Sequence, residues 1–216
     1  MIFHDIEQNT DEWLALRGGK LTGSGFGRIM PNFGKAFGDP AKKYATTIAV
    51  EQITGQPISS DYSNAHMERG HEQEPIARMR YEDEFFCDVT NGGFFDLGNI
   101  GVSPDGLVCG DGVIEIKSVI ASVHYASIKR QTYDPAYKWQ LVGNLFYTQR
   151  DWIDFVSFCA DFPEDKRLYV CRVERDDFKQ EFEMLQQRVS QFFELVEQIK
   201  TDILNSNYNV TARAAA

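Results

Sequence analysis

Residues 112–119, GVIEIKSV, restrict the fold of this chain more than any other stretch. Their side chains alternate with the period of a β-strand, so Ile114 and Ile116 share one face while Glu115 and Lys117 share the other. Charges inside a strand that is otherwise apolar are costly to bury unless they are paired. We therefore expect a strand whose charged face serves a functional site.

A second acidic residue precedes this strand. Asp105 follows a Ser-Pro pair at the end of a short strand, and nine residues separate it from Glu115. Antiparallel pairing of the two strands would bring these carboxylates close together. They would repel each other unless a cation lay between them, and Mg²⁺ typically takes one or two carboxylates with waters and phosphate oxygens. With Lys117 placed to orient or deprotonate a water, the pattern D-x9-E-x-K predicts metal-assisted hydrolysis of a phosphodiester.

An E-x-K pattern is also common on strands that face solvent, so the functional interpretation needs further support. It comes from the SPDG turn and from Glu74, the only charge on an otherwise apolar helical stripe. The other residues of that stripe are Met67, Gly70, Ala77, Tyr81 and Phe85. Pro75 suits a first helical turn better than an interior one, so this helix is expected to begin or kink there.

The remaining pattern predicts helices before and after a meander of strands. Helices are expected over residues 11–17, after Ser24, and over 44–55, 134–149 and 178–203, and strands over 85–90, 92–108, 112–119, 152–161 and 167–175. Residues 31–43 are expected to form an exposed loop, and residues 211–216 a disordered tail. This order favours one α/β (α+β) domain over residues 1–210, with a mixed central β-sheet flanked by helices.

Composition limits the class of protein. A net charge of −10 argues against a protein that coats nucleic acid by bulk electrostatics, unless acids gather at a metal and basic residues line a channel. The four cysteines form no C-x-x-C pair and are expected to be reduced core thiols, and the four histidines share no ligand spacing. Without an apolar span or an N-terminal signal segment, the chain is expected in the cytoplasm.

Four blocks of sequence carry a resemblance to a known family. They are EWLALRGGKLTGS, RGHEQEPIAR, SPDGLVCGDGVIEIK and AYKWQLVGNLFYT, and they cover nearly the whole chain in one order. The chain resembles the phage lambda exonuclease, or YqaJ-type viral recombinase, family of the PD-(D/E)xK nuclease superfamily. The resemblance implies a restriction-endonuclease-like core and a Mg²⁺-dependent exonuclease, with Mn²⁺ able to substitute. It also implies digestion of the 5'-ended strand of duplex DNA, a homotrimeric ring, and a single-strand annealing recombinase as partner.

The resemblance also implies roles for individual residues. Asp105, Glu115 and the main-chain carbonyl of Ile116 would hold the metal. Glu74 would support that metal site, directly or through water, and Gln140 would position Lys117 for activating the attacking water. Arg17, Ser24 and Ser103 would hold the 5'-phosphate.

Plainer roles stay open for some of these residues. Arg17 can stabilise the C-terminus of its helix, and Ser24 can be an N-cap. Trp13, Trp139 and Trp152 are expected in the core rather than as platforms for bases. Two rival functions also stay open, namely a related nuclease of other polarity or endonucleolytic action, and a non-catalytic protein that binds DNA ends.

Overall fold

The computed structural model describes residues 1–58 and 65–206, with the backbone alone for residues 65–68. The predicted α/β (α+β) class with a mixed sheet flanked by helices is confirmed, although the strands form two sheets where one central sheet was expected. The larger sheet has the order β3 (Val89–Asn91), β6 (Gly106–Val108), β7 (Gly112–Ser118), β8 (Trp152–Phe158), β9 (Leu168–Glu174). The smaller sheet has the order β1 (Ile2–His4), β4 (Phe94–Asp96), β5 (Ile100–Val102), β2 (Leu21–Thr22). Both sheets are mixed, because β7 pairs parallel with β8, and β2 with β5.

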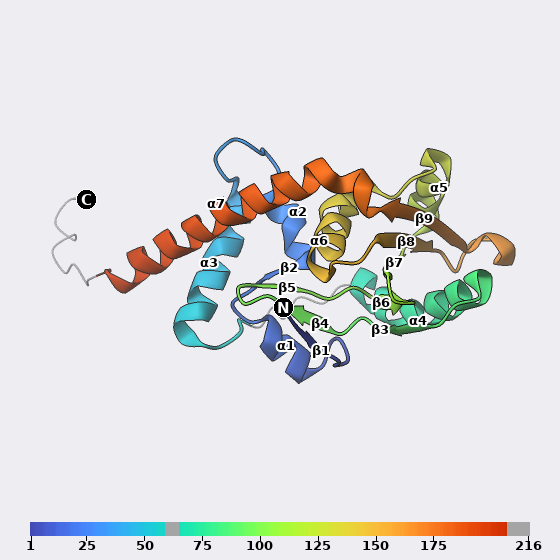
Figure 1. The fold of residues 1–216 in the computed structure, drawn as a ribbon, viewed down its shortest axis with the longest axis horizontal. Coiled ribbons are helices and arrows are strands. Elements are labelled where there is room, and N and C mark those ends of the chain that lie inside the picture. The colour runs from blue at the N-terminus through green and yellow to red at the C-terminus, as the bar shows by residue number, and fades with distance from the viewer. Residues whose placement is uncertain (59–64, 207–216) are drawn as a thin grey trace.

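Helices surround these sheets (Figure 1). The α-helices are α1 (Asp11–Arg17), α2 (Phe26–Ile29), α3 (Asp39–Thr54), α4 (Ala65–Phe85), α5 (Ala121–Arg130), α6 (Lys138–Thr148) and α7 (Lys179–Leu204). Short 3-10 helices are η1 (Gly23–Gly25), η2 (Pro135–Tyr137), η3 (Glu164–Lys166) and η4 (Arg175–Phe178). The long α7 runs across α6 and α3.

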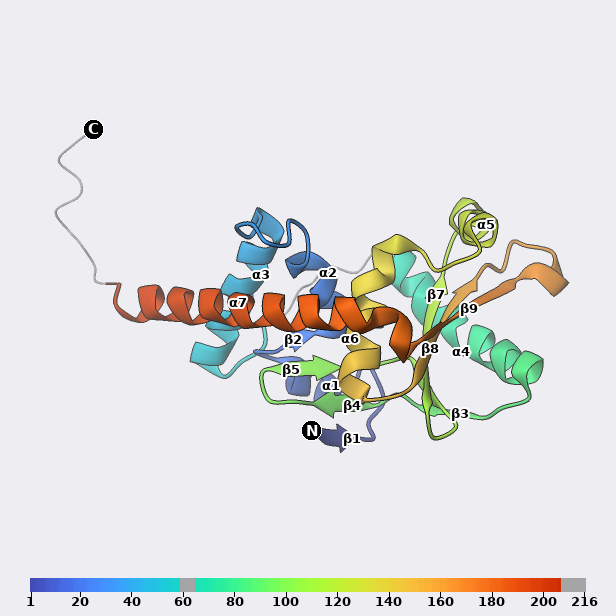
Figure 2. The ribbon, with the colours of Figure 1, turned by 45° about the horizontal axis from the view of Figure 1, so that its top comes forward.

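The strand β7 lies between two apolar layers, and Figure 2 shows α6 and α4 on opposite sides of it. Ile114 and Ile116 pack with Tyr81 of α4, whereas Val113 packs into the larger core with Leu141 of α6. The alternation predicted for this strand is therefore confirmed, and the face that carries Glu115 and Lys117 is the α6 face.

Local sequence signals explain where several helices begin and end. Thr10 caps α1, because its hydroxyl accepts a 3.2 Å hydrogen bond from the Trp13 amide. Gly55 ends α3 in the left-handed conformation, with φ of 67°, as the sequence predicted. The helix does not begin at Pro75, because α4 runs from Ala65 to Phe85 with Pro75 inside it.

Other expectations need correction. The helix α3 begins at Asp39, so residues 39–43 of the loop expected over 31–43 are helical, with Pro40 in the first turn where proline is tolerated. The strand expected over 85–90 starts at Val89 because α4 extends to Phe85. Ser24 lies inside η1 and Gly25 precedes α2, so the N-cap interpretation of Ser24 is wrong.

The cysteines are free, but of the four only Cys159 is buried, and Cys109 is exposed. The expectation of core thiols is therefore wrong for Cys109. In the described ranges no helix has the length and apolar character needed to cross a membrane. The predictions for the Met67 side chain and for residues 211–216 lie outside the described residues.

Candidate active site

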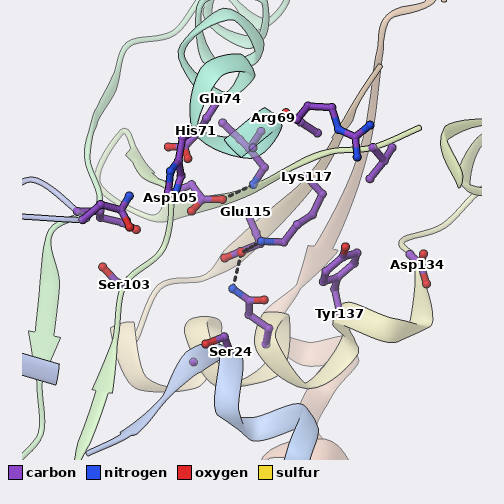
Figure 3. A pocket seen from close by; sticks show the side chains of 18 of the residues that line it. Ser24, Arg69, His71, Glu74, Ser103, Asp105, Glu115, Lys117, Asp134 and Tyr137 are labelled. Carbon is purple, nitrogen blue, oxygen red and sulfur yellow. Dashed lines mark hydrogen bonds and ion pairs between the residues drawn. The ribbon is translucent and has the colours of Figure 1, made fainter. Parts of the chain in front are cut away.

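A cavity of about 590 Å³ opens where α1, η1, α4, β7 and the start of α6 meet. Figure 3 shows the charged side chains of Asp105, Glu115 and Lys117 near its centre, with Glu74 on the helix above and Ser24 below. All nine residues that the sequence singled out line it: Arg17, Ser24, Glu74, Ser103, Asp105, Glu115, Ile116, Lys117 and Gln140. The structure thus gathers residues that are up to 123 positions apart in the chain, from Arg17 to Gln140.

 Eight of these residues were singled out for their side chains, and the ninth, Ile116, for its main-chain carbonyl.

The pairing of β6 with β7 places Asp105 beside the middle of β7. The Asp105 amide donates to the Ile114 carbonyl at 3.0 Å, and Asp105 Oδ2 accepts a 2.6 Å hydrogen bond from the Ile116 amide. Asp105 is 9% exposed and Glu115 is fully buried. The antiparallel pairing expected between these two strands is confirmed, and it holds the Asp105 carboxylate against the backbone of β7.

Three donors surround the Glu115 carboxylate. Lys117 Nζ and Gln140 Nε2 both donate to Oε1 at 2.5 Å, and Asn144 Nδ2 donates to Oε2 at 2.6 Å. Gln140 was expected to position Lys117. In the structure these two side chains meet through the Glu115 oxygen to which both donate.

Two buried carboxylates, those of Asp105 and Glu115, lie close together in this cluster and repel each other. Burial, with the nearby Asp105 charge, raises the pKa of Glu115 to about 8, and burial also raises the pKa of Asp105. For Lys117, burial lowers the pKa, but the Glu115 and Asp105 carboxylates outweigh it and raise the pKa above its ordinary value. The Lys117 ammonium acts on both buried carboxylates, and Arg78 offsets the Asp105 charge to a smaller extent.

This donor set fits a hard divalent cation. Asp105 and Glu115 offer carboxylate oxygens, and Ile116 between Glu115 and Lys117 lines the same cavity. In the described part of the chain no group of three or more His, Cys, Asp and Glu side chains is arranged to hold a metal. Two carboxylates suit Mg²⁺, which binds through one or two of them and keeps several waters.

Glu74 adds a third carboxylate at the edge of the cavity. Burial, followed by the Asp105 charge, raises the pKa of Glu74 to about 7. Arg78, one turn along α4, lies 3.5 Å from Glu74 Oε1 and also donates to the main-chain oxygen of Asp105. This arginine, which the sequence did not single out, therefore ties α4 to the turn that carries Asp105.

The three residues expected to hold a phosphate lie along the other side of the cavity. The Arg17 guanidinium lies 3.9 Å from the centre of the Trp13 ring, and burial lowers the pKa of Arg17. Trp13 Nε1 donates to Ser103 Oγ at 2.9 Å, and Ser103 in turn donates to the Gly93 carbonyl. Ser24 is exposed in η1. Trp13 is largely buried, as expected, but it also links Arg17 to Ser103.

Sequence reasoning missed Asn144, Arg78 and Tyr137 as residues of this region. Tyr137 lies with its ring centre 5.2 Å from Lys117 Nζ. Asn144 follows Gln140 by four residues, the spacing that places two side chains on the same side of a helix. That spacing was the available signal for Asn144.

Comparisons with known proteins show which family and which fold this chain shares. The profile of the YqaJ-like viral recombinase domain matches residues 12–151. An alkaline exonuclease (LHK-Exo) from Laribacter hongkongensis is 32% identical, with a TM-score of 0.76 over 90% of this chain and 98% of that chain. A second structure of LHK-Exo, in complex with dAMP, is 33% identical, with the same TM-score and coverage.

A phage related exonuclease from Haemophilus somnus 129PT is 18% identical, with a TM-score of 0.67 over 85% of this chain and 96% of that chain, and it supports the fold alone. A search of curated proteins gives no match. The profile match and the similarity to LHK-Exo show that the chain belongs to the YqaJ-like viral recombinase family and is an enzyme with the fold of the alkaline exonucleases.

Proposed function

We propose that this protein is a Mg²⁺-dependent exonuclease that digests the 5'-ended strand of linear double-stranded DNA and leaves 3' overhangs. One observation carries the proposal: the buried cluster of Asp105, Glu115 and Lys117 opens into the same cavity as Arg17 and Ser24. Residues 1–210 form the nuclease domain in this proposal. The similarity to LHK-Exo, an alkaline exonuclease that has been crystallised with dAMP, supports a deoxynucleotide product.

In this mechanism Asp105, Glu115 and the Ile116 carbonyl would hold the cation, with Glu74 supporting it directly or through a water. When bound, the cation would supply Lewis-acid stabilisation of the negative charge that develops on the phosphate. The Lys117 ammonium, held at Glu115 Oε1, orients the attacking water and offsets the negative charge that develops as the water attacks the phosphate. Gln140 fixes the oxygen that Lys117 contacts, which is how it positions the lysine.

The residues that bind the phosphate determine where the enzyme acts. Arg17 offers a planar fork of N–H donors for a terminal 5'-phosphate, and Ser24 adds a hydroxyl group. Ser103 would add a second hydroxyl group by turning its proton from the Gly93 carbonyl to the phosphate. Because Trp13 contacts both Arg17 and Ser103, it fixes the positions of these two side chains relative to each other. A site that binds a terminal phosphate selects DNA ends over interior phosphodiesters.

The proposal extends to the assembly. A ring-shaped homotrimer would hold duplex DNA in its central channel, and the 3' overhang would be passed to a single-strand annealing recombinase in the cytoplasm. The family of viral recombinases to which the chain belongs supports this role in recombination.

A digestion assay on three substrates tests the proposed function. Linear duplexes with a 5'-phosphate or a 5'-hydroxyl and a closed circular duplex are incubated with Mg²⁺, or with EDTA as the control. We expect digestion of the linear substrates alone, fastest with the 5'-phosphate, loss of the 5'-ended strand first, and no reaction in EDTA. Cutting of the circle would favour an endonuclease, loss of the 3'-ended strand would favour the opposite polarity, and end binding without digestion would favour a non-catalytic protein.

A further inference from the structure

We propose that Asn144 is a positioning residue that orients the Glu115 carboxylate for the divalent cation. This inference rests on the proposed function, because it takes Glu115 to be a metal ligand. Asn144 lies on α6, is 1% exposed, and donates from Nδ2 to Glu115 Oε2 at 2.6 Å.

The two oxygens of Glu115 are held by different groups. Oε1 accepts from Lys117 Nζ and Gln140 Nε2, whereas Oε2 accepts from Asn144 Nδ2. A carboxylate oxygen has about two lone-pair sites, so the bonds to Oε1 fill its capacity and Oε2 keeps one site for a further partner. Oε2 is therefore the oxygen of Glu115 that is available to a cation, and Asn144 determines the direction in which its remaining lone pair points.

Gln140 and Asn144 act on this carboxylate from one rigid element. They are four residues apart, so their side chains leave α6 on the same side and reach the two oxygens of one carboxylate. Two amides one helical turn apart fix the plane of the carboxylate as well as its position. With a single donor, the carboxylate could still rotate about the Cγ–Cδ bond of Glu115.

The rest of the Asn144 side chain shows that its amide is not there for packing. Among the described residues Asn144 Oδ1 is buried without a hydrogen-bond partner, and a buried unpaired amide oxygen is destabilising. An apolar side chain of the same shape would avoid that loss. The hydrogen bond from Nδ2 to Glu115 is the one feature of this side chain that an apolar replacement would remove.

Asn144 is also held in place from the opposite side. A Cβ atom at Gly23 would lie 2.8 Å from Asn144 Oδ1, so the backbone of η1 packs directly against this amide. Gly23 precedes Ser24 and lines the cavity. Asn144 therefore lies between the turn that carries Ser24 and the carboxylate of Glu115.

The test compares metal binding with DNA binding. Mn²⁺ binding is measured by isothermal titration calorimetry without DNA for the wild type, Asn144→Leu and Asn144→Ser. The Mg²⁺ concentration for half-maximal digestion and the KM for DNA ends are measured for the same proteins. We expect the Mn²⁺ Kd and the half-saturating Mg²⁺ concentration to rise about tenfold or more in both variants, as for other groups that orient metal ligands, with KM for DNA ends within about twofold.

Thr148→Val is the matched control. Thr148 is buried on α6 and donates to the Asn144 carbonyl at 2.7 Å, so its replacement perturbs the same helix without removing a bond to Glu115. Its Mn²⁺ Kd should equal that of the wild type even where its thermal stability falls. Asn144→Ser provides the measurement if Asn144→Leu does not fold.

This inference would be overturned if a folded Asn144 variant bound Mn²⁺ as tightly as the wild type, or if Thr148→Val lost as much Mn²⁺ affinity as the Asn144 variants. Either result would leave the proposed function standing. A wild type that binds no Mn²⁺ would overturn both.

Discussion

Single residues of this protein carry charges that folding alone does not explain. Glu115 is fully buried in a strand, and burial with the Asp105 charge raises its pKa to about 8. Such an arrangement destabilises the metal-free fold, because a buried carboxylate is expensive to ionise. A cation at this position would offset this penalty, as the proposed metal site requires.

The raised pKa values predict how stability depends on pH. The pKa of Glu74 is raised to about 7 and that of Glu115 to about 8, so between about pH 5 and about pH 8 the folded state binds more protons than the unfolded state. The free energy of unfolding of the metal-free protein should therefore fall as the pH rises through this range. Urea unfolding in EDTA at several pH values measures this free energy. Glu115→Gln should make the free energy of unfolding depend less on pH. A metal-free protein that becomes more stable toward pH 8 would contradict the account.

Trp13 gives a second prediction at this scale. Trp13→Phe removes the hydrogen bond to Ser103 and weakens the contact with the Arg17 guanidinium, while keeping an aromatic ring in the core. The two losses together are worth about 1.5 kcal/mol, so KM for 5'-phosphorylated ends should rise about tenfold with kcat less affected. Steady-state kinetics measure the change.

Trp152→Phe is the control for Trp13, because Trp152 begins β8 and contacts Arg172 rather than the cavity. An equal rise in KM in both variants would show that Trp13 acts through general stability alone.

Some of these residues can be recognised from the sequence and others cannot, for physical reasons. Glu115 and Lys117 stand out because a strand alternates its faces, and Asp105 because it precedes a turn into that strand. Asn144 is harder to recognise, because its four-residue spacing from Gln140 indicates the side of the helix that they share but not the residue that Asn144 contacts. Its partner, Glu115, is 29 residues away and is brought to it by the packing of α6 on β7.

At the scale of elements, α6 carries two of the donors to Glu115, Gln140 and Asn144. The distance of α6 from neighbouring elements therefore decides whether these donors reach the carboxylate. Gly143 lets α6 approach α2 closely, since a Cβ atom there would lie 2.2 Å from the Phe26 ring. Phe26 is fully buried and cannot move without disturbing the core.

Gly143→Ala should therefore destabilise the protein by about 1–3 kcal/mol through overpacking. It should also weaken Mg²⁺ activation, because a displaced α6 withdraws Gln140 and Asn144 from Glu115. Chemical denaturation and Mg²⁺ titration of activity measure the two effects.

Gly27→Ala is the matched control on α2, where an added Cβ would meet no atom within 4 Å. It should be neutral or slightly stabilising, because alanine favours a helix. A Gly143→Ala variant as stable as Gly27→Ala would contradict the proposed close packing.

Elements with a strong period were predictable, and those defined by long-range pairing were not. The strand β7 follows a period of two in its sequence and the helix α7 a period of three and four, whereas β8 is buried along its whole length and is marked by its apolar run. The helix α5 was missed: its buried positions include the polar residues His124 and Ser127, so no apolar stripe marks it. The division into two sheets depends on pairings such as β1 with β4, across about 90 residues, which no local pattern encodes.

At the scale of the whole molecule, the net charge of −10 limits how the protein binds DNA. Arg17, Arg69 and Lys117 are the cations among the described residues that line the cavity, and Lys117 is paired with Glu115. Binding to DNA ends should therefore depend on a few phosphate contacts rather than on a broad basic surface.

Arg17→Ala should lower the slope of the logarithm of the end-binding constant against the logarithm of salt concentration by about one. It should also abolish the preference for a 5'-phosphate over a 5'-hydroxyl. Fluorescence anisotropy over a salt series measures both effects. Lys43→Ala, on the exposed surface of α3, is the control and should leave the preference for the 5'-phosphate unchanged; an unchanged slope and preference in Arg17→Ala would contradict the role given to Arg17.

The central claim is that the Asp105, Glu115 and Lys117 cluster hydrolyses DNA from its ends. The most direct measurement compares the wild type with Lys117→Ala on a linear 5'-phosphorylated duplex in Mg²⁺, with end binding measured in parallel and folding checked by thermal unfolding. The account predicts that nucleotide release falls at least about 100-fold while end binding is retained. Undiminished release by a folded Lys117→Ala protein would contradict it.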